Sequence, residues 1–301
     1  MSFWRPAIQS LHLGLERFRR NINRNRRIQS ILIEGEEYNE VELLGKGAFG
    51  TVVLVRAKNH SEKQFAVKIL STRRNQTFSA TEVYFLRLLP PHENIIRMIE
   101  MIKTPDFYQV VLEYATEGTL SDKLVENVPM KAKIAQYFFK HLIEGLSCIH
   151  EHGIMHNDIK PDNLLITRQG DKEILKISDF GLSMLFRSDK SERILHYING
   201  TDAYNAPEMY SRSFRGPPID IWAAGIVLIV MLTTKEPWSK AVRTNRSYLN
   251  WIVGEQGIWE HIDDFSLDFI KTILQFDPAI RAAIPTIKQS PWYRHDFNTA
   301  S

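Results

Sequence analysis

The sequence of 301 residues has little cysteine, little net charge and no long hydrophobic run. Its single cysteine, Cys148, excludes an internal disulfide framework and indicates a reducing compartment. The longest uncharged apolar run, 221–232, is too short for a membrane span, which needs about 20 residues, and predicts a buried core helix. No signal peptide is visible, because Arg5, His12 and Glu16 interrupt the first apolar residues. We therefore expect an intracellular protein of the nucleus, the cytoplasm or both.

The net charge of +3 is unevenly distributed along the chain. Residues 1–30 contain seven arginines and one acid, which gives this leader a charge of +6 and leaves −3 for the rest. The net negative charge of residues 31–301 therefore argues against nucleic-acid binding by this part of the chain. The leader fits a solvated tail, a nuclear-import signal, or an arm that binds phospholipid or nucleic acid. An Arg-rich, acid-poor leader is also compatible with mitochondrial import, and the sequence leaves these alternatives open.

A β-rich part of the chain is followed by a helical part. Short β-branched segments at 51–57, 64–70 and 108–112 predict strands, and one helix over about 77–89 interrupts them. In 131–152, polar and apolar residues each recur at steps of three or four, which predicts a long amphipathic helix. This order indicates an α+β protein with two lobes and a ligand-binding cleft between them.

Three glycines lie in the segment 45–52, with the sequence GKGAFGTV. Glycine allows a backbone to approach phosphate groups closely. Strand residues follow these glycines, whereas a helix follows them in a dinucleotide fold, so a flexible hairpin over a nucleotide is favoured. Taken alone, the segment fits an ordinary glycine-rich turn equally well.

Lys68 lies within an apolar strand, on the face that it shares with Ala66 and Leu70. An ammonium group that points inward needs an anionic partner, and Glu82 is the only acid between Lys68 and Glu93. The segment 79–82 also reads as a helix capping box. The two interpretations of Glu82 have equal weight.

The segment 156–163, HNDIKPDN, is followed at a short distance by 179–181, DFG. Two carboxylates and an amide oxygen at these spacings suit Mg²⁺, which binds through oxygens together with substrate phosphates. Asp158 is then left to accept a hydroxyl proton, and both spacings match a catalytic pattern. A transition-metal site at His150, His152 and His156 is disfavoured, because the i, i+2 spacing puts the first two on different helix faces.

Taken together, these motifs resemble the eukaryotic protein kinase domain over about 38–292. Further matching motifs are Gly200-Thr201, Ala206-Pro207-Glu208, Asp220-x-Trp222-x-x-Gly225 and Asp277-Pro278-x-x-Arg281. Within this family the chain is most similar to the calcium/calmodulin-dependent kinase group and to kinases of the checkpoint kinase 1 type. The resemblance implies a basic, flexible extension over 1–37, a kinase domain over 38–295 and a short tail over 296–301. The N-lobe (38–113) is expected to be a small antiparallel sheet with one main helix, and the C-lobe (116–295) to be mostly helical.

The resemblance also implies the residues of an ATP-dependent transfer site. The catalytic residues are Asp158, the base, and Lys160, which contacts the transferring phosphate, while Asn163 and Asp179 hold Mg²⁺. Glu208 is expected to pair with Arg281, and Asp220 to anchor the catalytic loop. The residues expected to bind the ATP cofactor are Leu44, Gly45, Lys46, Gly47, Ala48, Phe49, Gly50, Thr51, Val52, Ala66, Lys68, Glu82, Glu113 and Ala115.

The expected function is therefore a serine/threonine protein kinase, monomeric, acting on protein substrates in checkpoint, DNA-damage or cell-cycle signalling. One alternative is a catalytically silent scaffold with a kinase fold, and another is a small-molecule kinase of related fold. The segment 200–208, which builds a peptide-binding surface in protein kinases, argues against the second alternative. We expect no membrane span, and no nucleic-acid contact by the kinase domain.

Two positions and the length of one connection depart from the usual pattern of the family. Asn157 replaces the common arginine, and Thr119 replaces an acid that reads a substrate arginine in related kinases, although Asp162 keeps an acid at a second such position. The connection from Lys68 to Glu82 is also short, so the sequence leaves open whether these two residues pair.

Overall fold

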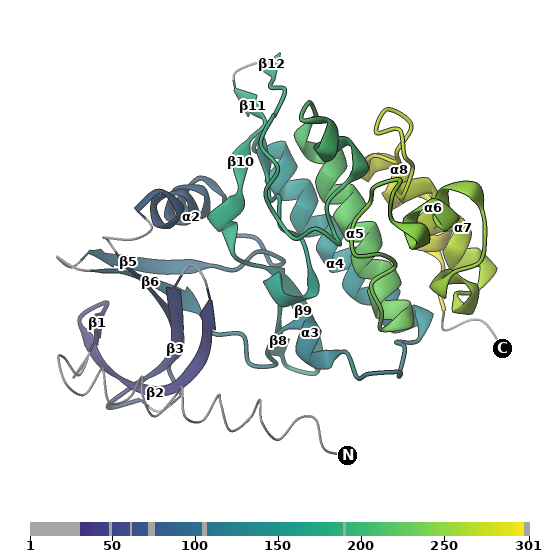
Figure 1. Cartoon of the computed structure of the whole chain (residues 1–301). Helices are drawn as coiled ribbons and strands as arrows, with labels where there is room; N and C mark the ends of the chain where they lie inside the picture. Colours follow the sequence, from purple (N-terminus) through teal and green to yellow (C-terminus); the bar gives the residue numbers. More distant parts are fainter. Residues whose placement is uncertain are drawn as a thin grey trace, which may run out of the picture.

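The computed structural model describes residues 31–297, apart from 48–49, 61, 72–75, 104–106 and 189–190. The described residues form two lobes, a strongly curved sheet with one helix beside it and a larger, mostly helical part (Figure 1). The α+β, bilobal fold expected from the sequence is therefore confirmed.

The N-lobe is built on one antiparallel sheet with the strand order β1-β2-β3-β4-β6-β5. Alternation of side chains gives the sheet two buried faces: Val55 and Val67 lie in a small outer core, whereas Ala66 and Leu70 join the main core. The strands are β1 (Ile31–Ile33), β2 (Glu36–Gly47), β3 (Gly50–Ala57), β4 (Gln64–Ser71), β5 (Met98–Lys103) and β6 (Phe107–Glu113).

Strand β1 lies in the segment that the sequence analysis assigned to a flexible extension. Ile31 and Ile33 are buried in the outer core, Leu32 points to solvent, and the strand pairs with the start of β2. A turn at Glu34 and Gly35, both at positive φ, connects the two strands. The described sheet therefore begins before the expected boundary at Tyr38.

Helix α2 (Gln76–Leu88) coincides with the helix expected over about 77–89. Its buried side chains Val83, Phe85 and Leu86 join the main core. The helix also packs against η2 (Phe180–Leu182), which belongs to the C-lobe. Side chains of α2 can therefore reach groups in the cleft between the lobes.

The C-lobe surrounds helix α5, whose side chains are almost all buried. Among the described helices, α5 alone has the length and composition of a membrane span, but 89% of it is buried inside the protein, as expected for a core helix. The helices are α3 (Leu120–Lys123), α4 (Ala132–Glu151), α5 (Gly216–Thr233), α6 (Arg246–Val253), α7 (Asp264–Ile273), α8 (Ile284–Gln289) and α9 (Pro291–Arg294), with η3 (Pro207–Ser211) and η4 (Ile258–His261).

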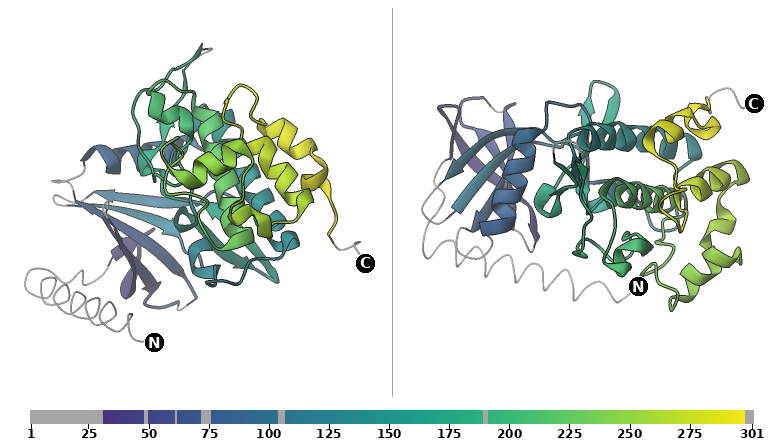
Figure 2. Two further views of the ribbon diagram at one scale, coloured as in Figure 1. Left: turned by 45° about the vertical axis from the view of Figure 1, so that its right-hand side comes forward. Right: turned by 90° about the horizontal axis from the view of Figure 1, so that it is seen from above.

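Short strands and turns lie where the two lobes meet, as the view from above in Figure 2 shows. They are β7 (Ile154–Met155), η1 (Pro161–Asn163), β8 (Leu164–Gln169), β9 (Lys172–Ile177), η2 and β10 (Met184–Leu185), followed by the hairpin of β11 (Arg187–Ser188) and β12 (Ser191–Glu192). Strand β7 pairs with β10, and β8 pairs with β9. This pairing brings the loop after β7 beside the turn after β9.

The two lobes are also joined beside the end of β6. The carboxylate of Glu113 accepts a hydrogen bond from the Arg97 N–H (2.8 Å) and forms an ion pair with Lys176 of β9 (3.0 Å). Backbone hydrogen bonds join Ile96 to Ile177 and Ile177 to Asn94. The segment 94–97, which precedes β5, is therefore fixed to the C-lobe.

Candidate active site

The loop 156–163, between β7 and β8, is held from below by one buried carboxylate of α5. Asp220 is 1% exposed and accepts hydrogen bonds from the backbone N–H groups of His156 and Asn157, both at 2.8 Å. The His150 ring lies 2.8 Å from the same carboxylate. The anchoring role expected for Asp220 is thus visible in the geometry, and it fixes the backbone just before Asp158.

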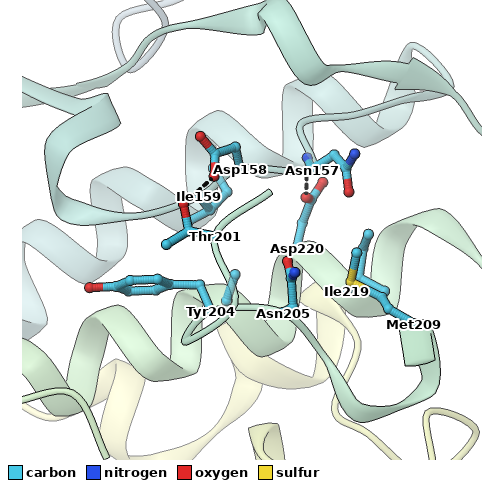
Figure 3. A pocket seen from close by; sticks show the side chains of 10 residues that line it. Asn157, Asp158, Ile159, Thr201, Tyr204, Asn205, Met209, Ile219 and Asp220 are labelled. Carbon is cyan, nitrogen blue, oxygen red and sulfur yellow. Dashed lines mark hydrogen bonds between the residues drawn. The ribbon is translucent and has the colours of Figure 1, made fainter. Parts of the chain in front are cut away.

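The buried Asp158 carboxylate lies in a network of polar groups. The Thr201 hydroxyl donates to Oδ1 at 2.9 Å, and the Asn163 amide donates to Oδ2 at 2.9 Å (Figure 3 shows the Thr201 contact). The Lys160 ammonium lies 2.9 Å from Oδ2 and donates to the Thr201 hydroxyl at 2.8 Å. Both oxygens of Asp158 are therefore held in a defined orientation.

Thr201 has a role at this site that the sequence analysis did not identify. The sequence analysis gave it only as part of the Gly200-Thr201 motif. Its hydroxyl joins Asp158 and Lys160, which lie far away in the sequence. A Cβ at Gly200, where φ is +91°, would approach the Asn157 carbonyl oxygen to 2.6 Å. Glycine at 200 thus lets the backbone before Thr201 approach the catalytic loop closely.

Lys68 and Glu82 form the ion pair that the sequence left open, with 2.7 Å between Nζ and Oε2. The Lys68 ammonium also donates to the Asp179 carboxylate at 3.0 Å. Burial disfavours the charged ammonium, but the carboxylates of Glu82 and Asp179 outweigh burial and raise the pKa of Lys68. Since α2 begins at Gln76, Glu82 lies in the helix interior and is not part of an N-terminal capping box.

Asp179 lies at positive φ (61°) and caps η2, where its carboxylate accepts a hydrogen bond from the Gly181 N–H. Burial favours its neutral form, yet the Lys68 ammonium, together with the Gly181 N–H, outweighs burial and lowers the pKa of Asp179. Asp179 is therefore an anion held opposite the catalytic loop.

Two oxygen donors in the cleft suit a hard divalent cation. The Asn163 side chain uses its NH₂ group to bind Asp158, which leaves its carbonyl oxygen as an acceptor, and Asp179 supplies a carboxylate. Among the residues that the structure describes, no three His, Cys, Asp or Glu side chains cluster as a metal site. This donor set fits an ion such as Mg²⁺, which takes a few protein oxygens and completes its shell with phosphates and water.

The three histidines considered for a transition metal each form a hydrogen bond with a different protein group. The His150 ring contacts Asp220, the His152 ring contacts the Cys148 carbonyl oxygen, and the His156 ring contacts the Ser178 carbonyl oxygen, each at 2.8 Å. These separate partners account for all three rings without a shared ligand.

The hairpin of β2 and β3 contains the glycine-rich segment, with Gly45 opposite Val52 and Gly47 opposite Gly50. A Cβ at Gly50 would lie 2.5 Å from the Ile69 carbonyl oxygen, so this position requires glycine. Lys46 and Thr51 are opposite each other in the same hairpin, whereas Ala48 and Phe49 lie outside the described residues.

Ala66 of β4 pairs with Leu112 of β6, and Val52 of β3 pairs with Lys68. This register places the apolar residues beside the ammonium. The remaining nucleotide-site candidates lie at the edges of the same region: Leu44 is 39% exposed on β2, Glu113 ends β6, and Ala115 is buried just after it.

A hollow of about 550 Å³ lies in the C-lobe beside α6 and α7. Apolar and aromatic side chains such as Trp251, Trp259 and Phe276 line it. The candidate catalytic residues lie elsewhere, so cavity size does not locate the catalytic site in this protein.

Comparison with known sequences agrees with this geometry. A family model described as "Protein kinase domain" matches residues 38–293, so the chain belongs to the protein kinase family. It is 40% identical over 270 residues to the serine/threonine-protein kinase chk-1 of Caenorhabditis elegans, an alignment that covers 86% of this chain and 53% of the relative. Identity to the serine/threonine-protein kinase chk1 of Schizosaccharomyces pombe is 31%, covering 83% and 52%.

A calcium/calmodulin-dependent protein kinase type 1 of Caenorhabditis briggsae is 29% identical, covering 87% of this chain and 76% of the relative. The resemblance to checkpoint kinase 1 and to the calcium/calmodulin-dependent group is therefore confirmed. The chain spans about half the length of the chk-1 relatives that it matches.

Proposed function

We propose that this chain is a serine/threonine protein kinase that transfers the γ-phosphate of ATP to Ser or Thr hydroxyls of protein substrates. The observation that supports this proposal is the meeting of Lys68, Asp158, Asn163 and Asp179 from three segments of the chain. A silent scaffold has no need for this complete set of charged and metal-binding groups. Those residues therefore favour an enzyme over the scaffold alternative.

The nucleotide is proposed to bind between the β2–β3 hairpin and the end of β6. Lys68, fixed by Glu82, would contact the α and β phosphates, because a raised pKa keeps its ammonium charged. The apolar residues Ala66 and Val52 would enclose the adenine. The Glu113 carboxylate is occupied by Arg97 and Lys176, so Glu113 and Ala115 would contribute through their backbones.

Asn163 and Asp179 are proposed to hold Mg²⁺, which neutralises charge on the phosphates when it is bound. Asp158 would accept the proton of the substrate hydroxyl and orient its oxygen toward the phosphate. Thr201 and Asn163 hold the two carboxylate oxygens in place, and Lys160 supplies positive charge at the transferring group. The protein contributes positioning and charge compensation rather than covalent chemistry.

We propose only a modest preference for basic substrates. Glu117 forms two hydrogen bonds with Arg168, and Asp122 is engaged by Thr119 in a capping box at the start of α3. Asp162, by contrast, is exposed beside the catalytic loop. We propose that Asp162 gives a weak preference for arginine near the acceptor residue, with little help from Glu117 or Asp122.

A positional peptide library with labelled ATP tests activity and selectivity together. We expect Mg²⁺-dependent transfer to Ser and Thr peptides by the wild type and by Asp171→Asn, an exposed control at the β8–β9 turn. Asp158→Asn should lose transfer while it still binds ATP. Nucleotide binding by the wild type without any transfer would support the scaffold alternative, and acidic or proline-directed selection would contradict the proposed substrate preference.

We further propose a role in checkpoint, DNA-damage or cell-cycle signalling, as a monomer in the nucleus, the cytoplasm or both. The support is the similarity to kinases named chk-1 and chk1. Expression in Schizosaccharomyces pombe cells that lack chk1 tests this role. Restored arrest after DNA damage would support it, and failure of an expressed, active enzyme to restore arrest would argue against it.

A further inference from the structure

The catalytic loop and the segment after β9 are joined by side-chain hydrogen bonds. The His156 ring contacts the Ser178 carbonyl oxygen at 2.8 Å, and the Ser183 hydroxyl donates to the His156 carbonyl oxygen at 3.3 Å. Between these contacts, the Asn157 amide donates to the Leu182 carbonyl oxygen at 3.2 Å. Asp179, the metal-site candidate, lies within the segment that these contacts bracket.

The Asn157 backbone is held in a defined position. Asn157 is 5% exposed, and its N–H is bound to Asp220 at 2.8 Å. Its φ of 68° lies in the left-handed region, which asparagine enters at lower cost than most side chains. The amide is thus aimed at Leu182 from a rigid support.

The oxygen of the same amide is unpaired within the described part of the chain. Asn157 Oδ1 is buried without a hydrogen bond among the described residues, and Asn157 lines a small cavity of about 10 Å³ beside Asp158, Thr201 and Asp220 (Figure 3). Exchanging the amide O and N would place an oxygen against the Leu182 carbonyl, so the bond to Leu182 sets the orientation. A buried, unpaired oxygen opposes stability. We therefore attribute the Asn157 amide to the positioning of the Leu182 turn and not to a gain in folding stability.

We propose that Asn157 is a positioning residue that holds the Asp179 turn against the catalytic loop through the Leu182 carbonyl. The bond needs no modification of the loop 187–201, so the metal-binding carboxylate and the base are set relative to each other in the unmodified chain. This inference rests on the proposed kinase function.

The test compares Asn157→Gly, Asn157→Asp and the wild type as full chains. Glycine keeps the positive φ and removes the amide, whereas aspartate keeps the size and removes the donor. Asn127→Gly is the matched control, because Asn127 is also at positive φ (60°) but is exposed and precedes α4. The measurements are calorimetric affinity for a non-hydrolysable ATP analogue with and without Mg²⁺, the thermal midpoint, and kcat and KM.

We expect the affinity measured with Mg²⁺ to fall about two- to tenfold in Asn157→Gly, the range of one net hydrogen bond, and further in Asn157→Asp. Affinity without Mg²⁺ and the thermal midpoint of Asn157→Gly should stay at the wild-type values. Unchanged Mg²⁺-dependent affinity in both variants, or equal losses with and without Mg²⁺, would overturn the positioning role. Absence of Mg²⁺-dependent binding and transfer in the wild type would instead overturn the proposed function.

Discussion

Two buried ion pairs, one in each lobe, use similar groups in opposite ways. In the C-lobe, Arg281 donates to both oxygens of Glu208 and to the carbonyl oxygens of Pro218 and Gln275, and it lies 4.9 Å from the Trp222 ring centroid. These five hydrogen bonds use every N–H that a guanidinium has. The pair is complete within the protein.

The N-lobe pair is incomplete by comparison. The Lys68 ammonium contacts Glu82 and Asp179, which leaves one of its three N–H donors for a further acceptor. One of its partners, Asp179, has a side chain that is 30% exposed at the cleft. An ion pair whose N–H donors are all used within the protein stabilises the fold. An ion pair that keeps an unused N–H donor near the surface can bind a ligand.

The largest expected effect is on the complete pair. Arg281→Met should lower the free energy of unfolding by about 3–5 kcal/mol, because it leaves Glu208 buried and unpaired. Urea unfolding measures this loss. The double variant Arg281→Met/Glu208→Gln should recover part of it, since no buried charge then remains alone, and a double variant as unstable as the sum of the single ones would contradict this account.

Lys68→Met should instead affect catalysis. We expect kcat/KM to fall by about 10²-fold or more, the size of effect seen when a group that stabilises transition-state charge is removed. The free energy of unfolding should change less than in Arg281→Met, because Lys68→Met removes two ionic contacts whereas Arg281→Met removes five hydrogen bonds. Lys288→Met is a useful control, because it removes a lysine of α8 that is paired with Glu144 outside the candidate site. Greater destabilisation by Lys68→Met than by Arg281→Met would reverse the contrast between the two pairs.

The pH dependence of stability reports the contribution of Asp179, the partly exposed partner of Lys68. Because the pKa of Asp179 is lowered in the folded state, its contribution is present above the unfolded value of about 3.9 and is lost as pH falls through the folded value. The difference in stability between wild type and Asp179→Asn should therefore be constant from about pH 5 to 8 and shrink below about pH 4. A difference that changes near neutral pH would contradict the lowered pKa.

The smallest expected effect is on the loop hydroxyls. Asn157 is short and uncharged, so it offers no cation to a phosphate on the loop, and an exposed pair with a neighbouring arginine is worth only about 0–1 kcal/mol. Ser188→Ala/Ser191→Ala, and phosphatase-treated wild type, should keep kcat/KM close to the starting value. A loss above about tenfold would show that the loop requires phosphorylation.

Local sequence was sufficient for much of the candidate site. Asp158, Lys160 and Asn163 lie within one short loop, so their spacing carries the information, and the expected helices and strands agree with the structure because their periodicity is regular. The pairing of Lys68 with Glu82 was undecided, because two patterns overlap in 79–82 and only the helix start at Gln76 separates them.

Contacts between distant segments could not be predicted in the same way. The bond from Asn157 to Leu182, and the position of the Thr201 hydroxyl beside Asp158, depend on how turns from different strands meet. Strand β1 was missed for another reason: its three residues are too few for a periodic signal, and an arginine-rich segment precedes them.

The attachment of residues 94–97 to β9 has a mechanical consequence. Because this segment and Glu113 are fixed to the C-lobe through Ile177 and Lys176, we expect any opening of the two lobes to be a rotation about this point. In such a rotation, displacement increases with distance from the axis. The β2–β3 hairpin, at the far side of the sheet in strand order, therefore travels further than β5 and β6. For the proposed kinase, we therefore expect product to leave past the hairpin, and the stiffness of this attachment to affect the rate of turnover.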